Sequence, residues 1–350
     1  MNAECRVDAV EWERWGQDCL RAQGFTDEDA RCLAESLAQT SLWGIDSHGI
    51  ARLPHYLNRV AHGSILARPK IRIERTGPGT AQLHGGQGQG IVVAHRANAL
   101  AMELARDAGI AAVGVSDSSH CGAIGLYSRA AAAQGLIGIA FTHSDSIAAP
   151  FGGHQAFFGT NPISLAFPRA GAEPLCLDMA TTAIPWNRVM NARRDGVTLP
   201  PGVAVDAQGR DCVDADHVRA LRPLGGEGYG YKGYGLAMMV ELLCGPLNGN
   251  PFGPHISPMY DELDRPRELG AFFIVIDPLR FAGGAALAGV VAGMAMELAQ
   301  APGAPRVPGD PEAAAQAERR RRGIPVPPAL WDQMADWSAR LGVALPQRAS

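Results

Sequence analysis

The stretch Ser116-Asp117-Ser118-Ser119-His120-Cys121-Gly122-Ala123-Ile124-Gly125 lies between two segments of different pattern. A run of small and β-branched residues over 111–115 precedes it, and a helical pattern over 124–134 follows it. This order predicts a strand, a turn and a helix. We therefore expect His120 in a glycine-flanked turn at the mouth of a sheet, where α/β proteins gather functional side chains.

A second histidine turn, Asp46-Ser47-His48-Gly49, lies upstream. Apolar residues recur at helical spacing from Ile50 to Val60, so His48 is expected just before a helix, near its positive end. Arg52 lies four residues after His48, and Tyr56 continues the same face. Spacing alone does not decide between two alternatives. Arg52 and Tyr56 line a pocket together with His48, or they only line the surface of a helix.

Further out, the chain alternates helical and strand patterns. Helices are expected over 8–24, 26–43, 183–194, 281–300 and 329–341, strands within 70–84, and a buried strand over 271–277. An apolar helix is expected over 236–244, with Lys232 at its entrance, where an ammonium and a helix N-terminus suit a phosphate or carboxylate. An aspartate, Asp178, closes another apolar strand.

The glycine-rich stretch 85–90 precedes a helical run to about residue 106. It does not match the dinucleotide pattern G-x-G-x-x-G, because after Gly86 and Gly88 the third glycine should fall on Ile91. A tight turn is the favoured interpretation. The run Arg319 to Arg322 is interpreted as a solvated helix end rather than a nucleic-acid site.

Composition excludes several classes of protein. The 350 residues are 47% hydrophobic and 19% charged, enough for a large core in two domains, or in one domain with an insertion. A net charge of −4 gives no reason to expect nucleic acid or an anionic membrane as partner. No apolar run approaches the roughly 18 to 20 residues of a membrane span. Seven scattered cysteines without C-x-x-C spacing, and an acidic N-terminus without a signal-peptide core, predict a cytoplasmic protein with reduced thiols.

Three kinds of chemistry suit the polar residues. His48, His120, His143 and Asp178 could hold zinc or iron in a metal-dependent hydrolase, but none of the usual metal-ligand spacings occurs and no metal is expected. Ser119 beside His120 could suggest a hydrolase dyad, but adjacent side chains do not normally face each other. Proton transfer coupled to hydride transfer is the third, since histidine supplies a proton near neutral pH and an arginine can orient a carboxylate.

Several motifs in register resemble one known family. They are Asp46-Ser47-His48-Gly49 with Arg52 and Tyr56, His120-Cys121-Gly122-Ala123, Phe151-Gly152-Gly153, Gly159-Thr160-Asn161-Pro162, Asp178-Met179-Ala180-Thr181, Lys232-Gly233-Tyr234-Gly235 and Pro308-Gly309-Asp310-Pro311. In this order the chain is similar, over nearly its whole length, to the type 2 malate/L-lactate dehydrogenase family, which includes ureidoglycolate and L-sulfolactate dehydrogenases and cyclic-imine reductases.

The resemblance implies a mixed α/β fold with a non-Rossmann dinucleotide-binding region and a helical portion formed by both terminal segments. The expected division is 1–69, 70–300 and 301–350. It also implies a homodimer that uses NAD or NADP to interconvert small 2-oxo and 2-hydroxy acids, with reduction of cyclic imino acids as the alternative.

By position in the motifs, the resemblance implies that His120 is the general acid and base. It assigns Ser47, His48, Arg52 and Tyr56 to a small carboxylate substrate, with Arg52 on the carboxylate itself. It assigns cofactor contacts to His48, Gly49, Ser144, Asp178, Met179, Ala180 and Lys232. The reader of a ribose 2′-phosphate stays open, and Arg188, Arg193 and Arg194 are candidates by charge alone.

Overall fold

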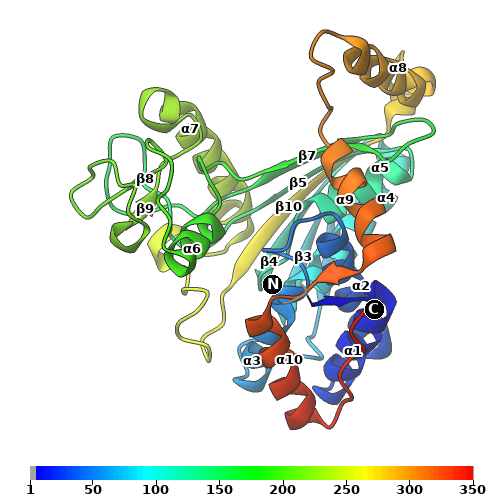
Figure 1. Ribbon diagram of the computed structural model, residues 1–350. Helices are drawn as coiled ribbons and strands as arrows, with labels where there is room; N and C mark the ends of the chain where they lie inside the picture. Colours follow the sequence, from blue (N-terminus) through cyan, green and yellow to red (C-terminus); the bar gives the residue numbers. More distant parts are fainter. Residues whose placement is uncertain (1–4, 350) are drawn as a thin grey trace.

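The computed structural model describes residues 5–349. A seven-stranded sheet runs through its centre in the order β2-β3-β4-β10-β5-β6-β7 (Figure 1). The strands are β2 (Arg72–Gly77), β3 (Thr80–Gly88), β4 (Ile110–Ser118), β5 (Ile137–Thr142), β6 (Ile163–Phe167), β7 (Leu175–Met179) and β10 (Leu269–Ile276). Strands β3 and β4 are parallel, and every other neighbouring pair in this sheet is antiparallel.

The expected buried strand near residue 271 is the centre of this sheet. In β10, Phe273 pairs with Val113 on one side and with Ala140 on the other. Both Phe273 and Val275 are fully buried, as the apolar run predicted. Helices α4 (Gly90–Ala108) and α5 (Gly125–Ala133) pack on the sheet and complete its core.

The two ends of the chain form a helical portion together. It contains α1 (Ala9–Ala22), α2 (Asp27–Leu42), α3 (Leu53–Ala61), α9 (Asp310–Arg322) and α10 (Pro328–Leu341). The short strands β1 (Arg6–Val7) and β11 (Ile324–Pro325) pair antiparallel and join the ends (Figure 1). Trp12, Leu37 and Met334 lie in its hydrophobic core, separate from the core of the sheet. The predicted helices at both ends are confirmed, whereas the domain boundaries stay a prediction.

A smaller lobe follows β7. It holds α6 (Trp186–Asp195), the strand pair β8 (Ala204–Val205) and β9 (Ala220–Leu221), and a core around Val189 and Leu221. Helix α7 (Gly226–Cys244) leads from it back toward the sheet (Figure 1). Helix α8 (Leu287–Gln300) lies at the far end of the molecule from this lobe.

Three expectations about the elements were wrong. Helix α7 begins at Gly226 rather than near 236, so Lys232 lies in its second turn and not at its entrance. Its glycines disfavour a helix in isolation, but Gly233 packs so closely on Leu224 that only a glycine fits, and tertiary contact decides. The helix expected from 281 begins at Leu287, because the turns Pro278–Arg280 and Gly284–Ala286 precede it.

The third concerns the glycine-rich stretch. Strand β3 continues to Gly88, with a register shift where Gly86 and Gln87 both have positive φ, so the stretch is an irregular strand end and not a turn.

Within residues 5–349, no helix is both long enough and apolar enough to cross a membrane. All seven cysteines lie in this range, and each carries a free thiol.

Candidate active site

His120 lies after the last residue of β4 and before the first residue of α5, as its flanking patterns predicted. The backbone N–H of Gly122 points at His120 Nδ1 from 3.3 Å, so Nδ1 accepts. The Tyr56 hydroxyl, 2.7 Å from the same nitrogen, is then the donor. With Nδ1 engaged, Nε2 is the nitrogen that can exchange a proton with a ligand.

Burial lowers the pKa of His120 well below its usual value, and the neighbouring His48 ring and the positive charge of Arg52 act in the same direction. The imidazole is therefore neutral at neutral pH. Burial also raises the pKa of Tyr56, which keeps its hydroxyl protonated.

Glycines bring a second backbone segment against this turn. A Cβ on Gly90, at the start of α4, would overlap the carbonyl oxygens of Ser119 and His120. The Ser119 hydroxyl joins the two segments, accepting from Gly90 N at 2.8 Å and donating to the Gly88 carbonyl at 3.1 Å. The glycine-rich stretch thus supports the His120 turn.

His48 stacks on His120, with ring centroids 5.4 Å apart and planes 26° from parallel. Its Nδ1 lies 2.8 Å from the Ser47 hydroxyl. Burial, followed by the charge of Arg52, lowers the pKa of His48 to about 3. A Cβ on Gly49 would overlap the Ser41 hydroxyl, so this glycine permits the turn to pack against α2.

Arg52 lies in the short helical turn Ile50–Arg52, directly before α3. Its Nε donates to the Ser47 carbonyl at 2.5 Å and its Nη1 to the Tyr260 hydroxyl at 2.6 Å. Tyr56, one helical turn later, reaches His120. Ser47, His48, Arg52, Tyr56 and His120 therefore form one connected group of side chains, whereas their lining of a common substrate pocket stays a prediction.

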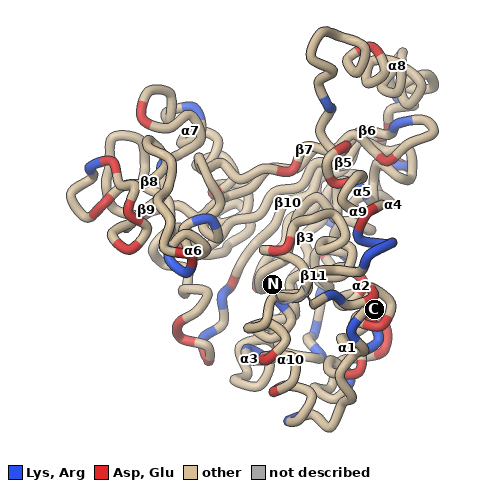
Figure 2. The backbone as a smooth tube through the Cα atoms, viewed as in Figure 1, with Lys and Arg blue, Asp and Glu red and all other residues tan. Residues whose placement is uncertain are grey.

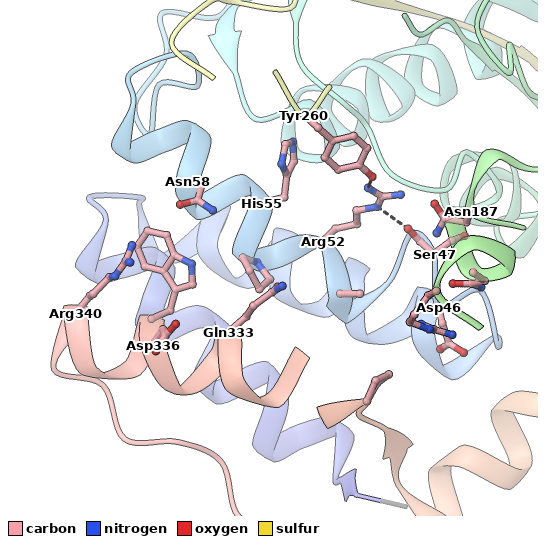
Figure 3. Close-up of a pocket in the computed structure, with 16 residues that line it drawn as sticks. Asp46, Ser47, Arg52, His55, Asn58, Asn187, Tyr260, Gln333, Asp336 and Arg340 are labelled. Atoms are coloured by element: carbon pink, nitrogen blue, oxygen red, sulfur yellow. Dashed lines mark hydrogen bonds between the residues drawn. The ribbon is translucent and has the colours of Figure 1, made fainter. Parts of the chain in front are cut away.

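A cavity of about 740 Å³ opens beside Arg52 (Figure 3). Ser47, Arg52 and His55 line one side of it, Asn187 of α6 lies across from Ser47, and α10 forms a further wall. The cavity therefore lies between the helical portion and the smaller lobe. Within residues 5–349, no three His, Cys, Asp or Glu side chains are grouped so that they could hold a metal ion.

A second group of predicted residues lies at one edge of the sheet. Ser144 follows β5, and Asp178 and Met179 end β7, with Ala180 next. The Ser144 hydroxyl accepts from Thr160 N at 3.3 Å, and Thr181 N donates to the Thr160 carbonyl at 2.9 Å, which links the two strand ends.

Asp178 connects this edge to the His120 turn, because its carboxylate accepts from Gly125 N at 2.8 Å. Burial raises the pKa of Asp178 to about 6, while the Gly125 hydrogen bond acts against the rise. This hydrogen bond joins the end of β7 to the first residue of α5, five residues after His120.

Lys232 is not joined to either group by any contact between described residues. Its ammonium lies 5.5 Å from the Tyr229 ring centroid and 5.9 Å from that of Tyr231, exposed on α7. Ser144 and Asp178 offer hydrogen-bonding groups and Lys232 an exposed ammonium, which are the types of side chain that ribose hydroxyls and phosphates bind.

The sequence patterns missed several residues of the site. Tyr260 lies in the segment 248–270, in which the sequence patterns single out no residue. Arg59 is fully buried and donates to the carbonyls of Pro258 and Met259, both at 2.9 Å. Its spacing of seven residues from Arg52, two helical turns, could have revealed it.

The arginine run forms the last turn of α9, as predicted, and Arg320, Arg321 and Arg322 are exposed. Arg319 differs, since its guanidinium forms a two-bond contact with Asp46 and donates to the Ser41 carbonyl at 2.6 Å. Figure 2 shows this basic end of α9 beside α2, with charges of both signs spread over the rest of the chain. Through Arg319, α9 therefore contacts the turn that contains Asp46 and His48.

The structure thus places a neutral imidazole in a half-buried turn, in one connected group with an arginine, on a mixed α/β fold. A family model described as malate/L-lactate dehydrogenase matches residues 7–335. The chain belongs to this family and is an oxidoreductase, which confirms the resemblance.

Individual relatives agree with the family match. The chain is 41% identical to an NAD(+)-dependent ureidoglycolate dehydrogenase of Escherichia coli O157:H7 over 73% of this chain and 72% of the relative. The solved sulfolactate dehydrogenase of Methanocaldococcus jannaschii superimposes with a TM-score of 0.90 at 30% identity, covering 97% and 98% of the two chains. The δ1-piperideine-2-carboxylate reductase of Pseudomonas syringae pvar. tomato superimposes with a TM-score of 0.86 at 30% identity, covering 95% and 99%.

Proposed function

We propose that this oxidoreductase transfers a hydride between NAD or NADP and a small 2-oxo or 2-hydroxy acid, with His120 as the proton donor and acceptor. The observation that carries the proposal is the contact between His120 Nδ1 and the Tyr56 hydroxyl at 2.7 Å, one helical turn from Arg52. It supports an acid–base group and a carboxylate-binding group in one pocket.

The proposed chemistry depends on His120 Nε2, because Nδ1 is engaged by Tyr56 and Gly122. The nicotinamide, when bound, supplies or accepts the hydride. A carbonyl that receives a hydride develops negative charge on oxygen, and His120, in the form that carries protons on both ring nitrogens, gives the Nε2 proton to that oxygen. In the reverse direction Nε2 takes the proton from the hydroxyl when the neutral ring holds its own proton on Nδ1, which then donates to the Tyr56 oxygen. The Tyr56 hydroxyl can rotate to accept from Nδ1 whenever the ring carries both protons.

Arg52 orients the substrate in this proposal. A carboxylate on its guanidinium offsets one of the charges that lower the pKa of His120, so a bound substrate makes protonation of the imidazole easier. Ser47, His48 and Tyr56 complete the substrate pocket. His48, Gly49, Ser144, Asp178, Met179, Ala180 and Lys232 are proposed to contact the dinucleotide.

The wider proposals concern fold and assembly. The dinucleotide is proposed to bind without a Rossmann unit, which the antiparallel pairing of all but one strand pair supports. A homodimer is proposed because α8 exposes a nearly uncharged apolar face. A cytoplasmic location is proposed on the seven free thiols, and neither nucleic acid nor a membrane is proposed as partner.

A second candidate is reduction of a cyclic imino acid. The similarity to a piperideine-2-carboxylate reductase favours it, and the reaction needs the same carboxylate-binding arginine with protonation at nitrogen in place of oxygen. No observation favours a metal-dependent hydrolase, and we do not propose it.

The test is a panel of 2-oxo acids and cyclic imino acids, each assayed with NADH and with NADPH. We expect turnover with a 2-oxo acid, and a His120→Ala variant should lose ~10²- to 10⁴-fold in kcat while binding the cofactor as before. His217→Ala, on an exposed histidine, is the matched control. Near-normal kcat in His120→Ala would rule out the assigned role, and turnover of imines alone would favour the second candidate.

A further inference from the structure

Arg52 offers only part of its guanidinium to a ligand. Its Nε is engaged by the Ser47 carbonyl and its Nη1 by the Tyr260 hydroxyl, with Met259 Sδ 3.8 Å from Nη1. No hydrogen bond from Nη2 to any other residue of the range 5–349 is present. A carboxylate that binds two donors therefore needs a second donor beside Nη2.

Tyr260 has such a donor. Its oxygen accepts from Arg52 Nη1, so its own hydrogen is left to donate, because a phenol both accepts and donates. No described residue accepts that hydrogen. Tyr260 and Arg52 both line the 740 Å³ cavity, where their side chains approach each other from different segments (Figure 3).

The segment that carries Tyr260 is held in place on both sides. Arg59 binds the carbonyls of Pro258 and Met259, as described above. Asp145 accepts from Met259 N at 3.3 Å and pairs with the buried Arg267. The tyrosine side chain is half-exposed, but its backbone is fixed by buried charged groups, so its hydroxyl has a defined place beside Arg52.

We infer that Tyr260 is a substrate-binding residue, and that the substrate carboxylate is bound by Arg52 Nη2 and the Tyr260 hydroxyl together. The inference rests on the proposed function, since it takes the carboxylate of a 2-oxo acid as the ligand. Arg52 supplies the positive charge, and the Tyr260 hydroxyl supplies a second hydrogen bond that fixes the orientation of the carboxylate.

The experiment measures binding apart from turnover. Oxamate, which carries a carboxylate beside a second carbonyl, is titrated into the complex with NADH and its Kd is followed by protein fluorescence. Tyr260→Phe removes only the hydroxyl, and we expect the Kd for oxamate and the KM for the 2-oxo acid to rise about 10- to 100-fold, as for a hydrogen bond to a charged group. The affinity for NADH should not change, and Tyr234→Phe is the matched control.

A double variant separates a shared site from two independent effects. If Arg52 and Tyr260 bind the same carboxylate, the loss in Arg52→Lys combined with Tyr260→Phe is smaller than the product of the single losses. Unchanged or tighter oxamate binding in Tyr260→Phe would overturn the inference, since the tyrosine would then be a bystander or a competitor of the ligand. Oxamate binding that depends on Tyr260 in a protein without turnover would instead count against the proposed reaction alone.

Discussion

Burial, the neighbouring His48 ring and the positive charge of Arg52 act in the same direction on the imidazole of His120. Each disfavours the charged ring, so His120 is neutral at neutral pH. In the proposed function, a substrate carboxylate on Arg52 offsets that positive charge. The proposal therefore couples substrate binding at Arg52 to the proton that the reaction needs.

Gly90 provides a test at the scale of one residue. Its missing side chain allows the start of α4 to touch the Ser119 and His120 carbonyls. We expect Gly90→Ala to push the His120 turn out of place and to lower kcat/KM at least 10-fold, since displacement of a catalytic group by about 1 Å costs on the order of 10²-fold.

The control for Gly90 is Gly135→Ala. Gly135 has positive φ but no atom within 4 Å of its would-be Cβ, so its substitution strains the backbone without moving the site. Equal activity losses in the two variants would show that general destabilisation, rather than the close approach, is responsible. Circular dichroism and thermal unfolding of both variants check that they fold.

Helices and strands whose apolar residues follow one clear pattern could be predicted from the sequence. The second N-terminal helix opens at the cap residue Thr26, whose side chain accepts from Asp29 N, and β10 is an unbroken apolar run. The start of α7 at Gly226 could not be predicted, because it depends on the close packing of Gly233 against Leu224, which precedes the helix. Helix propensity describes only the local preference of the glycines, and this tertiary contact overrides that preference.

The same distinction applies to the site. Spacing placed Arg52 and Tyr56 on one helix face, and the motifs singled out His48 and His120. Tyr260 could not be found in this way, since it reaches Arg52 from about 200 residues further along the chain. Only the fold brings that pair together.

Helix α8 allows a test of the proposed homodimer at the scale of an element. Val290 and Met294 lie one turn apart on its outer face and are 65% and 48% exposed, while Val291 and Ala295 are buried. We expect Val290→Asp to weaken self-association, because a charge in an apolar interface loses its hydration.

Sedimentation equilibrium over a range of concentrations measures the effect on self-association. Val10→Asp on α1, at a valine that is 60% exposed, is the matched control and should leave the assembly state unchanged. A wild-type protein that stays monomeric at all concentrations would contradict the dimer, and an unaffected dimer in Val290→Asp would exclude α8 from the interface.

At the scale of the whole molecule, half-buried histidines set a pH dependence of stability. Burial is the largest cause that lowers the pKa of His48 and His55 to about 3 and of His95 to about 4, and it lowers that of His120 too. Below pH 6.5 the unfolded chain binds protons that the folded chain refuses. Stability is therefore full above that pH and falls as the pH drops, by up to about 1.4 kcal/mol per pH unit for each such histidine.

Some groups oppose this trend, since burial raises the pKa of Asp178 and of Glu13, and these carboxyls favour the folded state as they take up protons.

The contribution of a single histidine to the pH dependence of stability can be measured at His95. Burial is the sole cause of its lowered pKa, and its Nε2 contacts the Ser36 hydroxyl at 2.9 Å, away from the site. Urea unfolding at pH 6.5 and pH 5 should show a loss of stability that is about 1 to 2 kcal/mol smaller in His95→Gln than in the wild type. The same substitution at the exposed His217 is the control, and an identical pH dependence in His95→Gln and wild type would mean that His95 takes up its proton without unfolding.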